Sequence, residues 1–331
     1  MKAKHVIIYL LLVIVTSSCI RDEAPNAEAD ILSCRLPGIT MTTSPIINNN
    51  SVTLFVTPGT NISALAPEFT LISGATITPA SGTERNFNSP QEYQVTAADG
   101  IWKKTYAISV IDTELATIYN FEDTISGKKY YIFVERENDK VIMEWASGNA
   151  GYAMTGVAKT ADDYPTFQIA NGKNGKCLSL VTRSTGFFGG LVGMPIAAGN
   201  LFIGSFDVNN AMSNPLQATK FGLPFRHVPT YLAGYYKYKA GDQFTEGGKP
   251  VEGKRDIYAI MYETSVSVPT LDGTNAFTSP NLVSMARIKD AKETDEWTYF
   301  KLPFTTLPGK FIDKEKLTMG KYNISIVFTS S

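Results

Sequence analysis

Hydrophobic and polar residues alternate in short segments along most of the chain, a period-2 pattern that predicts half-buried β-strands. In the first third, turn-forming pairs separate these segments. The clearest pair is Asp99-Gly100, interpreted as a type I′ turn that joins hairpin strands over 93–97 and 102–110. The spacing predicts one small sandwich over residues 36–112, with strands at Val52–Val56, Phe69–Ile72, Ala75–Thr78, Tyr93–Thr96 and Tyr106–Val110.

Residues 113–331 show no apolar pattern of helical period beyond a brief turn around 112–115. Long loops and the absence of an internal repeat instead predict a jelly roll or a related sandwich. The fold class is therefore all-β, a small sandwich followed by a larger β-jelly-roll sandwich. The candidate strands of the larger sandwich are Tyr130–Val134, Val141–Trp145, Lys176–Thr182, Leu201–Val208, Tyr231–Tyr238, Asp256–Tyr262, Leu282–Ile288, Thr298–Phe304 and Tyr322–Phe328.

The N-terminus has the layout of a secretory signal over residues 1–19. Lys2 and Lys4 precede an apolar run over 6–15, which leads into Thr16-Ser17-Ser18-Cys19, a lipoprotein-type cleavage site. The run is shorter than the roughly 20 residues that a membrane span needs. We therefore predict lipidation of Cys19, although Thr16 departs from the usual aliphatic residue and an ordinary secreted protein cut nearby is the alternative.

Residues 20–35 are polar and acidic, which predicts a flexible stalk between membrane and fold. The acidic pair Asp22-Glu23 resembles the surface-export tags of Bacteroidetes lipoproteins, and this resemblance implies an outer-membrane, surface-exposed location. A formal net charge of −1, with no basic stripe, argues against a nucleic-acid partner. Cys34 and Cys177 could pair in an oxidising compartment, but no spacing brings them together, so we expect both to be free.

Two segments carry a resemblance to known families. Residues 36–112, through the run Gly74–Thr83, the hairpin Tyr93–Gly100 and the strand at Lys104–Tyr106, resemble the immunoglobulin-like modules that precede functional domains in Bacteroidetes surface lipoproteins. This resemblance implies a spacer with an immunoglobulin-like sandwich.

Residues 113–331 resemble the putative carbohydrate metabolism domain of the same lipoproteins. The motifs occur in family order at Asn120–Asp123, Trp145–Tyr152, Tyr164-Pro165, Gly175-Lys176, Leu180–Arg183, Ala198–Gly204, Gly222–Phe225, Gly234–Gly241 and Ile326–Ser331. Family members continue past the final serines to one more strand. We therefore expect a C-terminally truncated jelly roll that leaves an unpaired sheet edge.

Glycan binding requires flat aromatic rings for the apolar faces of sugars, with amides or carboxylates for the hydroxyl groups. Tyr236 and Tyr238 share one face of their predicted strand, and Tyr235 takes the other. Any of these aromatic residues could instead be packed in the core. The candidate binding residues are Trp145, Asn149, Tyr152, Tyr164, Tyr236, Tyr238 and Trp297.

Hydrolysis of a glycosidic bond requires two carboxylates about 5–10 Å apart. Spacing fixes no such pair among the strand-associated carboxylates, and alternation turns Glu144 away from Trp145. With His227 as the one histidine after the signal, a histidine-pair zinc site or a Ser-His-Asp set is not expected. The carboxylates considered are Glu122, Asp123, Glu135, Glu144, Asp207, Asp256 and Glu263.

The stretch Asn120–Asp123 also resembles the opening strand of sugar-binding jelly rolls that hold a structural Ca²⁺, which would make Glu122 and Asp123 ligands. The alternative, which we favour, is that both are plain charges at the end of a strand. Together these observations predict a lipid-anchored surface protein that binds a glycan or polysaccharide as part of carbohydrate acquisition or metabolism. One alternative is a glycoside hydrolase that uses paired carboxylates. Another is a non-catalytic structural or adhesion lipoprotein with a protein partner.

Overall fold

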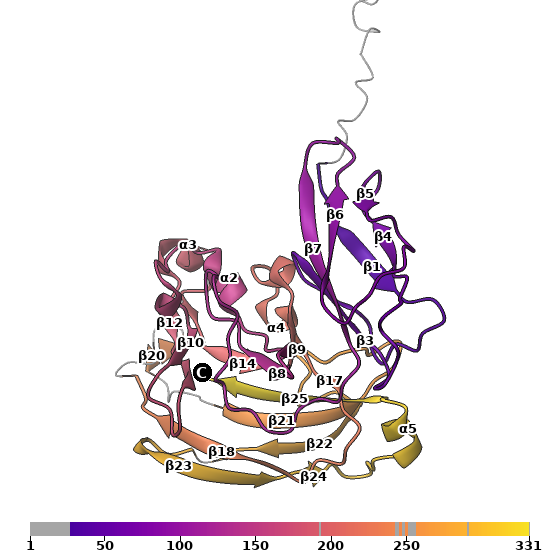
Figure 1. Cartoon of the computed structure of the whole chain (residues 1–331). Helices are drawn as coiled ribbons and strands as arrows, with labels where there is room; N and C mark the ends of the chain where they lie inside the picture. Colours follow the sequence, from indigo (N-terminus) through magenta and orange to yellow (C-terminus); the bar gives the residue numbers. More distant parts are fainter. Residues whose placement is uncertain are drawn as a thin grey trace, which may run out of the picture.

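The computed structural model describes residues 27–191, 193–241, 245–246, 249–250, 256–289 and 291–330 (Figure 1). The predicted signal over 1–19, its Cys19, and residues 20–26 of the predicted stalk lie outside the described residues. The all-β prediction is confirmed, because strands dominate both halves of the chain. Among the described residues, no helix is long and apolar enough to cross a bilayer.

The first domain is a sandwich of two sheets. Strands β1 (Ile31–Arg35) and β4 (Glu68–Leu71) form one antiparallel pair. The other sheet has the order β2-β3-β7-β6-β5, in which β3 and β7 are parallel and the remaining pairs antiparallel. Its strands are β2 (Ile46–Ile47), β3 (Ser51–Phe55), β7 (Lys103–Ile111), β6 (Gln91–Thr96) and β5 (Thr76–Thr78).

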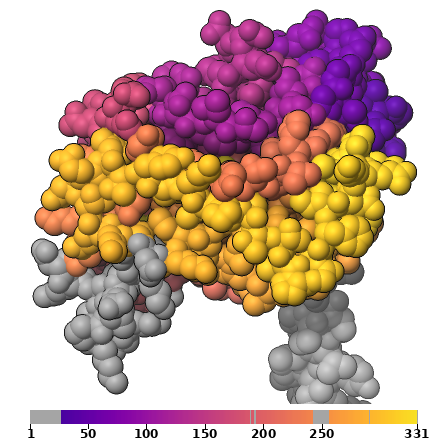
Figure 2. Space-filling model, turned by 90° about the horizontal axis from the view of Figure 1, so that it is seen from below, coloured from indigo at the N-terminus to yellow at the C-terminus, as the bar shows by residue number. Residues whose placement is uncertain are grey.

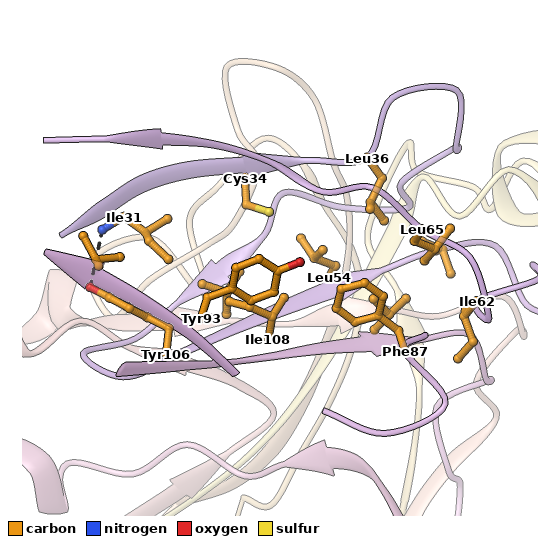
Figure 3. Close-up of a cluster of buried hydrophobic side chains, with 14 of the residues drawn as sticks. Ile31, Cys34, Leu36, Leu54, Ile62, Leu65, Phe87, Tyr93, Tyr106 and Ile108 are labelled. Carbon is orange, nitrogen blue, oxygen red and sulfur yellow. Dashed lines mark hydrogen bonds between the residues drawn. The ribbon is translucent and has the colours of Figure 1, made fainter. Parts of the chain in front are cut away.

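Alternate residues of these strands fill the core between the two sheets. Leu54, Tyr93 and Ile108 are almost fully buried and meet Phe87 and Cys34 in the centre of the domain (Figure 3). Cys34 and Cys177 are both free, as predicted. Burial raises the pKa of the Cys34 thiol to about 12, so this cysteine behaves as an inert core residue.

The stalk prediction is wrong for residues 31–35, which form β1. Ile31 and Cys34 are each 4% exposed, and the Ile31 N–H donates to the Tyr106 hydroxyl at 3.4 Å (Figure 3). Just before β1, Asp30 pairs with Lys104 at 2.6 Å. Ile31 and Cys34 are apolar residues in a polar stretch, so the local sequence does not indicate a strand. The segment becomes part of the fold because it pairs with β4, more than thirty residues later.

The hairpin between β6 and β7 is confirmed, but its turn is not type I′. Only Gly100 has a positive φ, 71°, and the Asp99 Oδ1 accepts hydrogen bonds from the N–H groups of Ile101 and Trp102 at 2.8 and 3.1 Å. The two-residue turn with positive φ occurs instead at Asn138-Asp139, with φ of 48° and 65°. It joins β8 (Val134–Glu137) to β9 (Lys140–Glu144).

The second domain is built on a six-stranded antiparallel sheet. Its order is β14-β25-β21-β22-β24, with β17 also paired to β25. The last strand, β25, is therefore paired along both sides and is not itself an exposed edge. The strands are β14 (Asn200–Phe202), β25 (Tyr322–Thr329), β21 (Asp256–Glu263), β22 (Leu282–Arg287), β24 (Thr305–Thr306) and β17 (Leu223–Pro224).

Both faces of this sheet are buried. One face packs Ala259 and Ile326 against Phe133 and Trp145 from the layer that contains β8 and β9. The opposite face packs Ile260 and other residues of a second cluster beneath connecting segments. The layer of shorter strands also contains the antiparallel pair β10 (Thr166–Ile169) and β11 (Cys177–Leu180).

A long antiparallel ribbon of β18 (Tyr231–Tyr238) and β23 (Thr294–Pro303) lies at the bottom of the second domain in Figure 1. Short elements make up the rest. They are α2 (Asn149–Ala153), η1 (Ala161–Asp163), β12 (Arg183–Ser184), α3 (Gly186–Leu191), β13 (Ile196–Ala197), β15 (Gly204–Phe206), η2 (Val208–Asn210), α4 (Pro215–Ala218), β16 (Thr219–Phe221), β19 (Thr245–Glu246), β20 (Lys249–Pro250) and α5 (Lys314–Thr318).

The two domains pack directly on each other. Phe55 and Ile111, at the ends of β3 and β7, belong to the same buried cluster as Trp145 of the second domain. Lys140 on β9 pairs with Asp112 at 3.0 Å across this contact. The first domain therefore rises from one end of the second, as Figure 1 shows.

Candidate functional site

Four of the predicted sugar-contacting residues are buried. Trp145, Asn149, Tyr152 and Tyr164 are between 0 and 4% exposed. Trp145 packs against Phe121, with ring centroids 5.4 Å apart, inside the core of the second domain. Because a sugar must stack on an accessible ring face, the assignment of these four residues to glycan contact is wrong.

The contacts of these buried residues are structural. The Asn149 Nδ2 donates to the Thr166 carbonyl at 2.7 Å, and its Oδ1 accepts from the Thr166 N–H at 3.1 Å, which fastens α2 to β10. The Tyr152 hydroxyl donates to the Ser184 carbonyl at 2.9 Å. The Tyr164 ring packs on Tyr152 at 5.7 Å. The sequence motif that contains them therefore specifies how the short strands and helices assemble.

The exposed aromatic residues gather instead on the outer face of the β18–β23 ribbon. Tyr231, Tyr235 and Tyr299 are 54, 48 and 55% exposed. Tyr235 and Tyr299 are direct partners across the ribbon, with ring centroids 5.2 Å apart. Trp297, two residues before Tyr299 on β23, is half-buried on the same side. We call these four residues the aromatic strip.

The inner face of the same ribbon holds the strip in place. Leu232 and Phe300 are less than 10% exposed and belong to the core of the second domain. Tyr236 lies on this inner side, packs on Phe300 at 6.3 Å and donates to the Lys292 carbonyl at 3.4 Å. Tyr238 is half-buried on the same side. The prediction that Tyr236 and Tyr238 contact glycan is therefore not supported by their orientation, whereas Trp297 remains a candidate.

The strip runs along the ribbon rather than clustering at one point. Tyr231 and Tyr235 are four residues apart on one strand, which corresponds to about 13 Å. Figure 2, seen from below, shows orange and yellow segments of the second domain side by side with a band of indigo and magenta segments. Strand alternation correctly predicts that Tyr235 lies on the opposite face from Tyr236, but Tyr231 and Tyr299 were not among the predicted binding residues. The apolar Leu232 is the sequence feature that could have identified them, because it marks the inner face of the strand and so assigns its neighbour Tyr231 to the outer face.

Glu135 is the carboxylate with the most distinctive environment. Its Oε1 accepts a hydrogen bond from the Trp145 Nε1–H at 2.8 Å. Burial raises the pKa of Glu135, the Trp145 hydrogen bond lowers it, and the negative charge of Asp123 raises it again, with a net shift upward. The Val134 N–H donates to the Asp123 carbonyl at 3.1 Å, which places Asp123 beside the residue that precedes Glu135, although sequence spacing did not select the two carboxylates as a pair.

The other carboxylates do not converge with this pair. Glu144 faces away from Trp145, as alternation predicted, and desolvation raises its pKa against the opposing charge of Lys128. Asp256 accepts from the Arg287 Nε–H at 2.8 Å. Two further carboxylates have structural partners: Asp207 accepts from the Asn209 N–H at 3.0 Å, and Glu263 pairs with Lys316 at 2.7 Å.

A cavity of about 370 Å³ lies beside α5. Glu263, Asn281, Asp313, Lys316 and Tyr322 are among its lining residues. The Glu263–Lys316 ion pair, the Asp313 cap of α5 and the hydrogen bond from the Lys310 Nζ to the Pro280 carbonyl already satisfy its charged groups. The cavity therefore offers no second free carboxylate to pair with Glu263.

The predicted calcium ligands do not fit that ion. The Glu122 Oε1 accepts from the Lys176 N–H at 2.9 Å, and the Glu122 carbonyl accepts from the Gln168 Nε2 at 3.0 Å. Asp123 has an exposed side chain. No group of three potential metal-ligating side chains occurs among the described residues. Oxygen atoms that already face N–H donors are poorly arranged for a hard cation.

Comparisons with known proteins agree with this architecture. Residues 120–331 match the family model "Putative carbohydrate metabolism domain", and residues 31–110 match the model "SGBP, N-terminal". The second match begins at β1, in agreement with the correction of the stalk. None of the curated proteins matches the chain.

Two solved structures from Bacteroides are similar to the chain. A putative glycoside hydrolase from Bacteroides thetaiotaomicron VPI-5482 is 83% identical with a TM-score of 0.90, over 94% of this chain and 92% of that chain. A putative glycoside hydrolase from Bacteroides vulgatus ATCC 8482 is 48% identical with a TM-score of 0.60, over 64% of this chain and 88% of that chain.

Proposed function

Because the chain belongs to the family of the putative carbohydrate metabolism domain, we propose that it is a lipid-anchored surface protein that binds glycans through its aromatic strip. The family supports a carbohydrate-associated role. The observation that carries the binding proposal is the row of rings on the outer face of the ribbon, with Tyr235 and Tyr299 paired at its centre.

The strip has the properties that sugar stacking requires. The rings present about half of their surface to solvent at Tyr231, Tyr235 and Tyr299. Their backbone is held by the buried Leu232 and Phe300 on the other side of the ribbon. A platform that is ordered before binding loses little conformational entropy when the ligand arrives.

The position of the strip suits a protein tethered by its N-terminus. The described part of the chain begins in the first domain, which lies at the top of Figure 1, whereas β18 and β23 lie at the bottom. A lipid on Cys19 would therefore attach at the end of the molecule away from the strip. This arrangement would leave the strip facing away from the membrane, and we propose an outer-membrane, surface-exposed location on this basis. Globomycin-sensitive processing and labelling of Cys19 with a palmitate analogue in cells would test the anchor.

Glycan binding is tested with a Tyr235→Ala/Tyr299→Ala double variant of the purified protein. Phe311→Ala is the matched control, because Phe311 is 73% exposed but follows β24 and lines the cavity beside α5. Binding to a panel of immobilised polysaccharides should be retained by the control and reduced about tenfold or more by the double variant. Equal binding by the double variant and the wild type would remove the strip as the glycan site.

Glycoside hydrolysis is the second candidate, favoured by Glu135 and by the description of the two similar structures. A carboxyl whose pKa is raised beside a second carboxylate has the character of a general acid. Reducing-sugar release from the same polysaccharides by wild-type protein, lost in Glu135→Gln, would establish this activity. Release that survives this substitution would exclude Glu135 as the acid.

A further inference from the structure

Three lysines lie over the rings of the aromatic strip. The Lys301 Nζ is 4.1 Å from the Tyr231 ring centroid, and the Lys173 Nζ is 4.3 Å from that of Tyr235. The Lys237 Nζ is 5.5 Å from that of Trp297. Each part of the strip therefore combines an apolar ring surface with a nearby positive charge.

These lysines come from different elements and converge on one surface. Lys237 is on β18 and Lys301 on β23, while Lys173 is in the loop that joins β10 to β11. All three side chains are exposed. Since the whole chain carries a formal net charge of only −1, this local excess of positive charge is a property of the strip and not of the protein as a whole.

The ammonium groups retain their capacity to bind an anion. None of them takes part in an ion pair within 4 Å in the described part of the chain. Carboxylates do lie in the neighbourhood: Asp295 and Glu296 are exposed at the start of β23, and Glu122 accepts from the Lys176 N–H in the loop that carries Lys173. Asp295 and Glu296 lie toward the Trp297 end and Glu122 lies beside the Lys173 loop, so Lys301 over Tyr231 carries the clearest positive charge.

We propose that the strip selects anionic glycans, those with carboxylate or sulfate groups on the sugar rings. This inference rests on the proposed glycan-binding function of the strip and specifies its ligand class. The apolar face of a sugar stacks on a tyrosine, and its acidic substituent pairs with the adjacent lysine. An exposed cation–π contact is weak, and lysine is a flexible point charge, so the ammonium group can turn toward the ligand at small cost.

The test uses two matched ligand pairs and a triple Lys173→Gln/Lys237→Gln/Lys301→Gln variant. The pairs are polygalacturonate with its methyl ester, and dextran sulfate with dextran. Lys314→Gln at the start of α5 is the control, because it removes one exposed lysine outside the strip. Binding is measured by affinity electrophoresis and by calorimetry at low and at high salt.

We expect the wild type and the control to bind at least one anionic ligand more tightly than its neutral partner. Each lysine lost should weaken that binding about two- to fivefold, the range of exposed ion pairs, and added salt should reduce the preference. The triple variant should bind the anionic and neutral ligands alike.

Two outcomes would overturn the inference. If neither anionic ligand binds better than its neutral partner, or if the triple variant keeps the preference, the lysines do not select charge. In either case the Tyr235→Ala/Tyr299→Ala variant distinguishes failure of the anionic preference from failure of glycan binding at the strip. Loss of neutral-glycan binding in that variant would preserve the proposed function of the strip while removing its anionic preference.

Discussion

Glu135 offers a substitution that separates a structural role from a catalytic one. Its carboxylate is the acceptor for the Trp145 Nε1–H, and Trp145 is only 3% exposed. Glu135→Ala would leave this indole N–H without its partner and away from bulk water. Glu135→Gln keeps a side chain of the same length with an oxygen acceptor and removes the negative charge.

The expected loss in Glu135→Ala follows from the unpaired donor. A buried donor without a partner costs about 1–3 kcal/mol. For a domain of this size, roughly 2–4 °C in Tm is lost for each kcal/mol, so the variant should unfold roughly 2–12 °C below the wild type. Glu135→Gln should avoid this loss, because the side-chain amide carbonyl can still accept from Trp145.

The difference in stability between the wild type and Glu135→Gln should depend on pH in a defined direction. Burial, the largest cause, raises the folded-state pKa of Glu135 above its ordinary value of 4.5. The contribution of this carboxyl to stability is therefore complete below pH 4.5 and is lost as pH rises through the folded-state pKa. Glu135→Gln, neutral at every pH, should be at least as stable as the wild type at pH 7, and its advantage should shrink toward pH 4.5.

Thermal and urea unfolding of the three proteins at pH 4.5 and pH 7 measures these differences. A Glu135→Ala variant as stable as the wild type would show that the Trp145 hydrogen bond contributes nothing. A Glu135→Gln variant as unstable as Glu135→Ala at pH 7 would show that Trp145 requires the charge. Because Glu135→Gln stays folded if the argument is correct, loss of any hydrolase activity in it could not be attributed to unfolding.

Gly204 has a φ of 148°, and a Cβ at this position would overlap the Lys220 carbonyl. Gly204→Ala should therefore lose several kcal/mol of unfolding free energy in urea, whereas Gly190→Ala should not, because a Cβ at Gly190 meets open space. Equal stability of the two variants would contradict this expectation. The hydrogen bond from Lys104 lowers the pKa of Asp30, so this carboxylate stabilises the fold above its unfolded-state pKa and the contribution disappears as pH falls through the lower, folded-state pKa. Unfolding from pH 7 to pH 2 should therefore show a shallower stability loss for Asp30→Asn than for the wild type, and parallel curves would count against this.

Most strands could be predicted from alternation, and the ribbon shows why. In β18 the apolar Leu232 and half-buried Tyr236 alternate with the exposed Tyr231 and Tyr235, so the period of two is visible in the sequence. What the sequence does not state is which aromatic face meets solvent. Tyrosine fits a core or a surface equally well, and only Leu232 and the partner strand decide between them.

Other features depend on contacts far apart in the chain. β1 is a strand because Ile31 and Cys34 meet a core formed by residues from 52 to 110. Trp145 is buried because the sheet of β21 and β25 covers the ring, which no local pattern around residue 145 indicates. The donors that occupy the oxygens of Glu122 come from Gln168 and Lys176, more than forty residues away.

These contacts bear on what a family resemblance can tell about this protein. The residues Trp145, Asn149, Tyr152 and Tyr164 carry much of the resemblance, and all four are buried in structural contacts. They specify how the sandwich assembles, so a match to them identifies the architecture. Under the proposed function, the chemistry presented to a glycan depends instead on solvent-facing positions of the ribbon, such as Tyr299, where a substitution leaves the core untouched. If the strip is the glycan site, ligand preference can change among proteins of this fold while their buried motifs remain the same, so substitutions at the strip are the test of that preference.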